Sequence, residues 1–159
     1  MLFLQATNPV STLLNRSEWL FPLCELFHIL GFGVAIGTVA LVDFSLLGGA
    51  LQEKRAPQLH QDTAPWTLIA LVIVVLSGMV LFLTDPLQYI YNFAFRFKMA
   101  ALVLAIVFNY TIHRRLALSL NASSQARALT GLVSMALWVS VVFAGLFIAF
   151  PHSLFGPYN

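Results

Sequence analysis

Four long apolar stretches set the strongest limit on what this chain can fold into. They cover roughly residues 20–50, 65–84, 96–116 and 126–150. A helix needs about 20 mostly apolar residues to cross a bilayer, and each stretch reaches that length. Only 9% of the 159 residues are charged and 60% are hydrophobic, whereas about 25% of an ordinary soluble domain is charged. The sequence therefore predicts one all-α domain, residues 1–159, that forms an integral membrane four-helix bundle.

The segments between the predicted spans contain residues that favour turns. Residues 52–65 are polar with two prolines, residues 84–95 contain Asp85-Pro86, and residues 118–125 contain Asn121 and two serines. Ahead of the first span, leucines and Trp19 alternate with polar residues, which fits a short interfacial helix over residues 11–19 as well as an ordered loop. The N-terminus lacks a basic region and a small-residue cleavage site, so we do not expect a signal peptide.

The distribution of cations predicts which side of the membrane the ends of the chain face. With four spans, both termini lie on one side, together with Arg16, Arg96 and Lys98. The opposite side holds five cations: Lys54, Arg55, Arg114, Arg115 and Arg127. Because cytoplasmic loops carry the excess of Lys and Arg, we expect the termini and the 85–95 loop on the outer side. In a Gram-negative bacterium this side is the periplasm, and the membrane is the cytoplasmic (inner) membrane.

Charge and cysteine content argue against several classes of function. A net charge of +2, with cations scattered between apolar runs, does not provide the basic face that nucleic acid requires. A single cysteine, Cys24, cannot form a disulfide within the chain, and there is no Cys-x-x-Cys-His motif to attach a c-type haem. No nucleotide-binding loop or protease motif is present, so the polar residues within the spans are the remaining candidates.

These polar residues fall into two layers. Spans one and three run in the same direction, and His28 and Lys98 lie near their starts. Asp43 and His113 follow fifteen residues later in each span, which is about 22 Å deeper at 1.5 Å per residue. The sequence thus predicts an outer and an inner polar layer.

The outer layer is the candidate cofactor site. Glu25 and His28 are three residues apart and share a helical face, Lys98 opens the third span, and His152 follows the fourth. These side chains can bind a metal or haem, or form a hydrogen-bonded proton site, and charged groups inside a bilayer usually have a function. An alternative carries equal weight: Lys98 extends to the membrane surface and His28 bonds a backbone carbonyl.

The inner layer is predicted to be structural. It contains Asp43, Asn109, His113 and Arg114, and Asp43 is expected to pair with Arg114 or His113 and so join spans one and three. A second cofactor ligand at His113 remains open. His60 lies in the polar 52–65 segment and is expected to be solvated.

Small residues predict where helices approach one another closely. Gly33 and Gly37 are four residues apart on span one, and Gly145 and Ala149 repeat this spacing on span four. We interpret them as packing positions within the bundle rather than as a dimerisation signal. If the bundle holds a flat macrocycle, the same glycines would make room for it.

Several of these residues also carry a resemblance to known families. The runs Leu26-Phe-His28-Ile-Leu-Gly-Phe-Gly and Val42-Asp43-Phe-Ser-Leu-Leu-Gly48 resemble the first helix of an uncharacterised bacterial four-helix membrane family related to CopD-like domains. Asp85-Pro86-x-x-Tyr89, Asn92-x-x-Phe95-x-x-Lys98 and Asn109-x-x-x-His113 resemble its second loop and third helix. The early histidine with a lysine opening helix three is distantly similar to HemJ-type protoporphyrinogen oxidases. That resemblance implies haem b binding at His28 and Lys98.

Three hypotheses for function follow. The first is a haem b protein that transfers electrons between quinol and a membrane or periplasmic redox partner, with His28 as axial ligand and Lys98 or His152 as second ligand or propionate partner. The second is a cofactor-free accessory subunit of a larger membrane complex. The third is passage of copper or a small solute, suggested by the CopD-like relatives. Copper(I) favours Cys and Met ligands, and Cys24, Met79, Met99 and Met135 lie on different spans.

Overall fold

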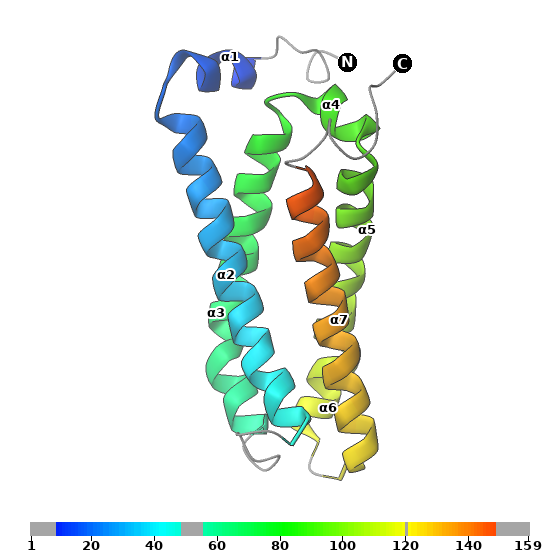
Figure 1. Cartoon of the computed structure of the whole chain (residues 1–159). Helices are drawn as coiled ribbons and strands as arrows, with labels where there is room; N and C mark the ends of the chain where they lie inside the picture. The colour runs from blue at the N-terminus through cyan, green and yellow to red at the C-terminus, as the bar shows by residue number, and fades with distance from the viewer. Residues whose placement is uncertain (1–8, 49–55, 120, 149–159) are drawn as a thin grey trace. The chain divides into compact units, whose positions relative to one another are not determined.

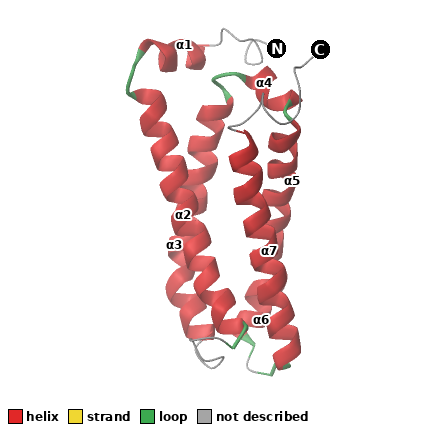
Figure 2. Cartoon of the chain, viewed as in Figure 1, coloured by secondary structure: helices red, strands yellow, loops and turns green. Residues whose placement is uncertain are grey.

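The chain is all-α throughout the part that the structure describes. The computed structural model describes residues 9–48, 56–119 and 121–148, and every regular element in these ranges is a helix (Figures 1 and 2). Three single helices, α2 (Leu20–Leu46), α3 (Ala56–Phe82) and α7 (Ser124–Ile148), are long and apolar enough to cross a membrane. A fourth stretch, Phe93–Leu118, is also long and apolar enough to cross a membrane. These four helices indicate a multi-pass membrane protein.

The fourth stretch consists of three consecutive helical segments. They are α5 (Phe93–Phe108), the π-helical turn η3 (Asn109–His113) and α6 (Arg114–Leu118). Two short helices complete the described fold: α1 (Pro9–Arg16) covers most of the expected interfacial segment, and α4 (Pro86–Tyr91) begins directly after Asp85.

Local hydrogen bonds explain where several helices begin and end. The Asn92 side chain accepts a hydrogen bond from the Phe95 backbone N–H at 3.2 Å and caps α5, and Ser123 caps α7 through the Ala126 N–H at 3.3 Å. After α2, the chain turns at Gly48, which has a φ of 70°. Glycine adopts this left-handed conformation without steric cost.

Helix α3 begins at Ala56, well before the start near residue 65 that the two prolines suggested. Pro57 lies in the first turn, where a backbone N–H has no helical partner in any case. Pro65 lies inside the helix and leaves one carbonyl without its usual donor. Burial offsets this loss, because Ala56 and Leu59 pack with Val42, Leu46 and Ala117. The expected polar loop is therefore wrong from residue 56 onward, while residues 49–55 lie outside the described ranges.

The helices pack as two compact units. The first unit contains α1, α2 up to Leu41, α3 from Gln61, and α4 up to Tyr89. The second unit contains the end of α2 from Val42, the start of α3 up to His60, and the chain from Ile90 onward. Each unit has buried contacts of its own, and helices α2 and α3 contribute to both.

In the first unit, α2 contacts α3 through a stripe of small residues. Gly31, Ala35 and Val39 are buried and four residues apart, so they share one face. A Cβ atom on Gly31 would lie 3.0 Å from Cγ2 of Val74, so the absence of a side chain permits the close approach. The Thr67 hydroxyl adds a 2.8 Å hydrogen bond to the Thr38 hydroxyl.

Gly33 and Gly37 do not take this role. Both are exposed, and a Cβ on either would meet no atom of the described chain within 4 Å. The prediction that these two glycines pack within the bundle is wrong, because two residues correspond to about 200° around a helix, which turns Gly33 away from the face of Gly31. The partner residue expected for Gly145, Ala149, lies outside the described ranges.

In the second unit, α5 packs along α7 through small buried residues, among them Ala101, Ala105 and Ala144. The end of α2 approaches α7 closely, because a Cβ on Gly131 would lie 3.0 Å from the backbone oxygen of Asp43. Small residues let the two backbones come together, as is usual for helices in membranes.

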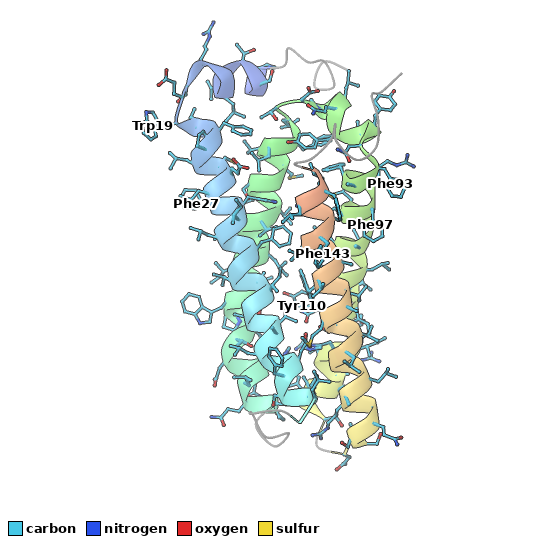
Figure 3. All side chains as sticks on the ribbon, in the orientation of Figure 1. Trp19, Phe27, Phe93, Phe97, Tyr110 and Phe143 are labelled. Carbon is cyan, nitrogen blue, oxygen red and sulfur yellow. The ribbon has the colours of Figure 1, made fainter. Side chains whose placement is uncertain are left out.

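Large apolar side chains cover the outer faces of the helices. In the first unit Trp19 and Phe27 project outward, and in the second unit so do Phe93, Phe97 and Phe143 (Figure 3). Exposed apolar side chains on this scale suit lipid rather than water as the surrounding medium.

We predict that Gly31→Val destabilises the protein and that Gly33→Val does not. The valine at position 31 would overlap Val74 and Ile73, and overpacking of this kind costs about 1–3 kcal/mol. Thermal unfolding in detergent, followed by circular dichroism, measures the difference. Equal unfolding temperatures for the two variants would contradict the assignment of Gly31 to the contact.

Candidate functional site

His28 is held from three sides within the first unit. Its Nδ1 lies 2.9 Å from the Ser77 hydroxyl oxygen on α3, and its ring meets Phe32 edge to face with centroids 5.2 Å apart. The ring also lies against Gly78, where a Cβ would come within 2.9 Å of the imidazole Cε1. Gly78 therefore provides the space that the imidazole occupies, and Ser77 sets the ring orientation.

The Ser77 hydroxyl determines which nitrogen of His28 carries the proton. Ser77 has a single O–H, and its oxygen lies 2.6 Å from the Ile73 backbone oxygen, to which it donates. The same oxygen then accepts from His28, an arrangement that favours the neutral imidazole with its proton on Nδ1. This tautomer leaves the lone pair on Nε2, a nitrogen through which histidine commonly binds metals.

Two further outer residues lie near this site. Cys24 donates a weak hydrogen bond from Sγ to the Ser77 backbone oxygen at 3.5 Å. Glu25 is exposed and acts electrostatically on Tyr89, a half-buried residue that packs against Phe82. Burial raises the pKa of Tyr89, and the negative charges of Glu25 and Asp85 raise it further, against a hydrogen bond with Thr84 that lowers it.

Lys98 belongs to the second unit, where its side chain runs across Gly145 of α7. A Cβ on Gly145 would lie 3.4 Å from the Lys98 Nζ and 3.7 Å from its Cε. The lysine is half-buried, and Gly145 makes room for it beside the helix. His152, the other residue expected in the outer layer, lies outside the described ranges.

The inner layer centres on a direct contact between Asp43 and His113. The Asp43 Oδ1 lies 2.7 Å from the His113 Nε2, and both side chains are only 1% exposed. Of the two partners that the sequence left open, His113 is therefore the one that Asp43 contacts, while Arg114 is exposed. Asn109, four residues before His113, is buried as well.

The π-helical turn η3 determines the direction of His113. It spans Asn109–His113 between α5 and α6, and both of these residues are buried. A π-turn inserts one extra residue into a helix and occurs frequently at functional sites. Since each residue of an α-helix turns about 100°, the insertion changes which residues of α6 face the interior.

His60 is not the solvated loop residue that the sequence suggested. It lies in the second turn of α3 and is half-buried, and its ring centroid is 6.3 Å from that of His113. That expectation failed because α3 starts earlier than its prolines suggested. Sequence reasoning also missed Ser77 and Gly78, for which the only signal was a pair of small residues, one of them polar, within an otherwise apolar run.

The chain does not bring together a conventional metal cluster in the part that is described. No group of three or more His, Cys, Asp or Glu side chains in those ranges is arranged to hold a metal ion. The Cys and Met residues considered as copper ligands belong to different units: Cys24 and Met79 lie in the first unit, and Met99 and Met135 lie in the second.

Comparison with known proteins identifies one family. The sequence model of DUF6644, a family of unknown function, matches residues 21–151, which include nearly all of the four long helices. No curated protein matches the chain. No solved structure matches it either.

We predict that Asp43 and His113 are energetically coupled. Asp43→Ala or His113→Ala alone leaves a buried polar partner and should lower the free energy of unfolding by about 3–5 kcal/mol. The double variant should lose clearly less than the sum of the single losses, because neither partner remains. Denaturant titration in mixed micelles measures these values, with the exposed neighbour Phe44→Ala as control. Additive losses would argue against a direct interaction.

Proposed function

We propose that the chain, which belongs to the DUF6644 family, binds haem b in the bacterial cytoplasmic membrane and takes part in electron transfer. The supporting observation is the orientation of His28. Its Nδ1 lies 2.9 Å from the Ser77 hydroxyl and its ring lies in the space beside Gly78, and a histidine held through Nδ1 binds iron through Nε2. A ligand histidine is typically fixed in this way by a hydrogen bond from its other nitrogen.

The donor set favours haem over a bare metal ion. Haem iron already has four ring nitrogens and requires only one or two ligands from the protein, commonly histidine. A bare ion would need several side chains in one place, and the described ranges contain no such group. A single oriented histidine in an apolar surrounding therefore suits a haem b site better.

The roles of Ser77, Gly78 and Phe32 follow from their contacts with His28, and those of Lys98 and His152 come from the sequence alone. Bound haem b would supply one-electron transfer at its iron. Ser77 would keep the imidazole in the tautomer that presents Nε2, and Gly78 and Phe32 would hold the ring in place. Lys98 is proposed as second ligand or as partner of a haem propionate, as is His152, in line with the resemblance of His28 and Lys98 to the HemJ-type pattern.

Orientation and partners form the remaining part of this proposal. The excess of cations in the segments around residues 54–55 and 114–127 supports a cytoplasmic position for those segments. The termini, and with them the His28 end of α2, would then face the outer side. Such a site could exchange electrons with quinol in the bilayer and with a membrane or periplasmic redox protein.

The haem proposal predicts a clear spectroscopic outcome. The purified protein should show a Soret band that shifts on reduction with dithionite, and His28→Ala should abolish it. Ser77→Ala should weaken haem binding by roughly 10–100-fold, as loss of a ligand-orienting hydrogen bond does, and Ser77→Thr, which keeps the hydroxyl, should restore much of the binding. His60→Ala is the matched control and should leave the spectrum unchanged.

The opposite result would favour the second candidate, an accessory subunit without a cofactor. One observation supports this alternative: the Nδ1 of His28 and the Oδ1 of Asp43 already have partners within the chain. A colourless preparation from haem-replete cells would contradict the haem proposal. Stoichiometric co-purification of partner subunits in mild detergent would then support the accessory role.

The orientation gives a separate prediction. Alkaline phosphatase fused to the C-terminus should be active, because the enzyme folds only outside the cytoplasm, whereas fusion at Ser123, between α6 and α7, should be inactive. Activity assays on intact cells, normalised to the amount of fusion protein, distinguish the two orientations. The reverse pattern would place the termini in the cytoplasm.

A further inference from the structure

The Asp43–His113 pair leaves two buried polar atoms beside it without a partner. The His113 Nε2 is held by Asp43, and the other ring nitrogen, Nδ1, meets no hydrogen-bond partner in the described part of the chain. The Ser134 hydroxyl of α7 is close enough to act on the Asp43 carboxyl group but also completes no hydrogen bond there. Buried polar atoms of this kind usually bind water or take part in chemistry.

A pair that serves only to join two helices would not require these atoms. The 2.7 Å contact between Asp43 and the His113 Nε2 would be enough to join the helices. An unpartnered Nδ1 in an apolar interior, by contrast, costs desolvation free energy. The helix is also altered at this point, because the π-turn Asn109–His113 ends on the histidine. The unpartnered Nδ1 and the π-turn both indicate a role for His113 beyond helix attachment.

The charge balance of the pair concerns a single proton. Besides the N–H of a neutral imidazole, the pair shares one dissociable proton. With this proton bound the pair has no net charge, either as carboxylate and imidazolium or as carboxylic acid and neutral imidazole. Without that proton the pair carries a net charge of −1, which is costly in an apolar interior. Binding of that proton therefore removes a net charge from the apolar interior, and the proton needs a path from water to reach the pair.

His60 lies where such a path would run. Its ring is adjacent to that of His113, with centroids 6.3 Å apart, and it is half-buried, so it reaches from the interior toward the surface of the second unit. The two rings share no direct hydrogen bond, and one water molecule is able to bridge a separation of this size. Imidazole is the side chain best suited to pass protons near neutral pH.

The cationic side chains on the surrounding helices are directed to places other than the Asp43–His113 pair. The positive charge of Arg114 in α6 interacts electrostatically with His60, and the Arg114 side chain itself is exposed. Arg127 of α7 is buried, and its Nη2 donates to the Ser119 backbone oxygen at 2.6 Å, where α6 ends. Lys98 of α5 lies beside Gly145, about four helical turns from His113 along the chain. Asp43 is thus the acidic group that contacts His113 among the described residues.

We propose that Asp43, His113 and Ser134 form a buried proton-binding site that exchanges with water through His60. A proton from hydronium binds to the neutral His60 ring, which passes a proton to the bridging water. That water donates one of its protons to the Nδ1 lone pair of His113, while the Nε2–H remains bonded to Asp43 or moves onto its Oδ1. One proton enters the pair and the water is restored, while His60 is neutral again in its other tautomer and returns to the first by exchanging its proton with solvent water.

This inference does not depend on haem. It concerns residues of the second unit, while His28 and Ser77 belong to the first. A protein without haem could still bind a proton here, so the two proposals fail independently.

Hydrogen–deuterium exchange at the imidazole Cε1, resolved by mass spectrometry, tests the inference in the full-length protein in liposomes. This exchange requires access of water and depends on the protonation of each histidine. We expect His113 to exchange with a pH-dependent rate. We also expect His60→Phe, which fills the same space without a nitrogen, to slow His113 exchange, because it removes the polar route by which water reaches the ring.

Two controls separate the path from general effects. Gln61→Phe places the same ring on the exposed neighbouring residue and should leave His113 exchange unchanged. Exchange at His28 should be the same in all variants. Wild-type His113 that does not exchange, or whose rate is independent of pH, would show a sealed structural pair and overturn the proposal. An unchanged His113 rate in His60→Phe would overturn the path through His60.

Discussion

A helix within lipid must satisfy its polar groups from the chain itself, and the rest of this structure depends on that constraint. The hydroxyls within the long helices illustrate it, because Thr38, Ser77 and Thr130 each donate to a backbone oxygen three or four residues earlier. Two ionisable side chains instead bond a residue on another helix. His28 bonds Ser77, and Asp43 bonds His113. The two contacts between helices therefore determine which helix faces meet.

Small residues make these contacts geometrically possible. Gly78 gives space to the His28 ring, Gly145 to the Lys98 side chain, and Gly131 to the backbone beside Asp43. In each case a glycine on one helix faces a polar group on another. Close helix packing and polar chemistry therefore use the same positions, and a larger residue at Gly78 would move the imidazole.

The general architecture could be predicted from the sequence because lipid imposes a simple length requirement. The four apolar stretches correspond to four long helices, and the depth argument placed Asp43 and His113 at the same level, where the structure brings them into contact. What sequence could not supply was rotation about each helix axis. Gly31 rather than Gly33 faces α3, and a π-turn changes the direction of His113, and neither follows from apolar periodicity. His60 was missed because burial of Ala56 and Leu59 extends α3 through its prolines.

The central claim of this account is that Ser77 orients His28 through its Nδ1 so that Nε2 is the ligand nitrogen, and the tautomer of His28 tests it most directly. Nitrogen-15 NMR of ring-labelled histidine in the haem-free protein distinguishes a protonated from an unprotonated ring nitrogen, and His28→Gln assigns the signal. The account predicts a protonated Nδ1 and an unprotonated Nε2 for neutral His28. A proton on Nε2 would mean that Ser77 donates to the imidazole, which would contradict the orientation on which the haem proposal rests.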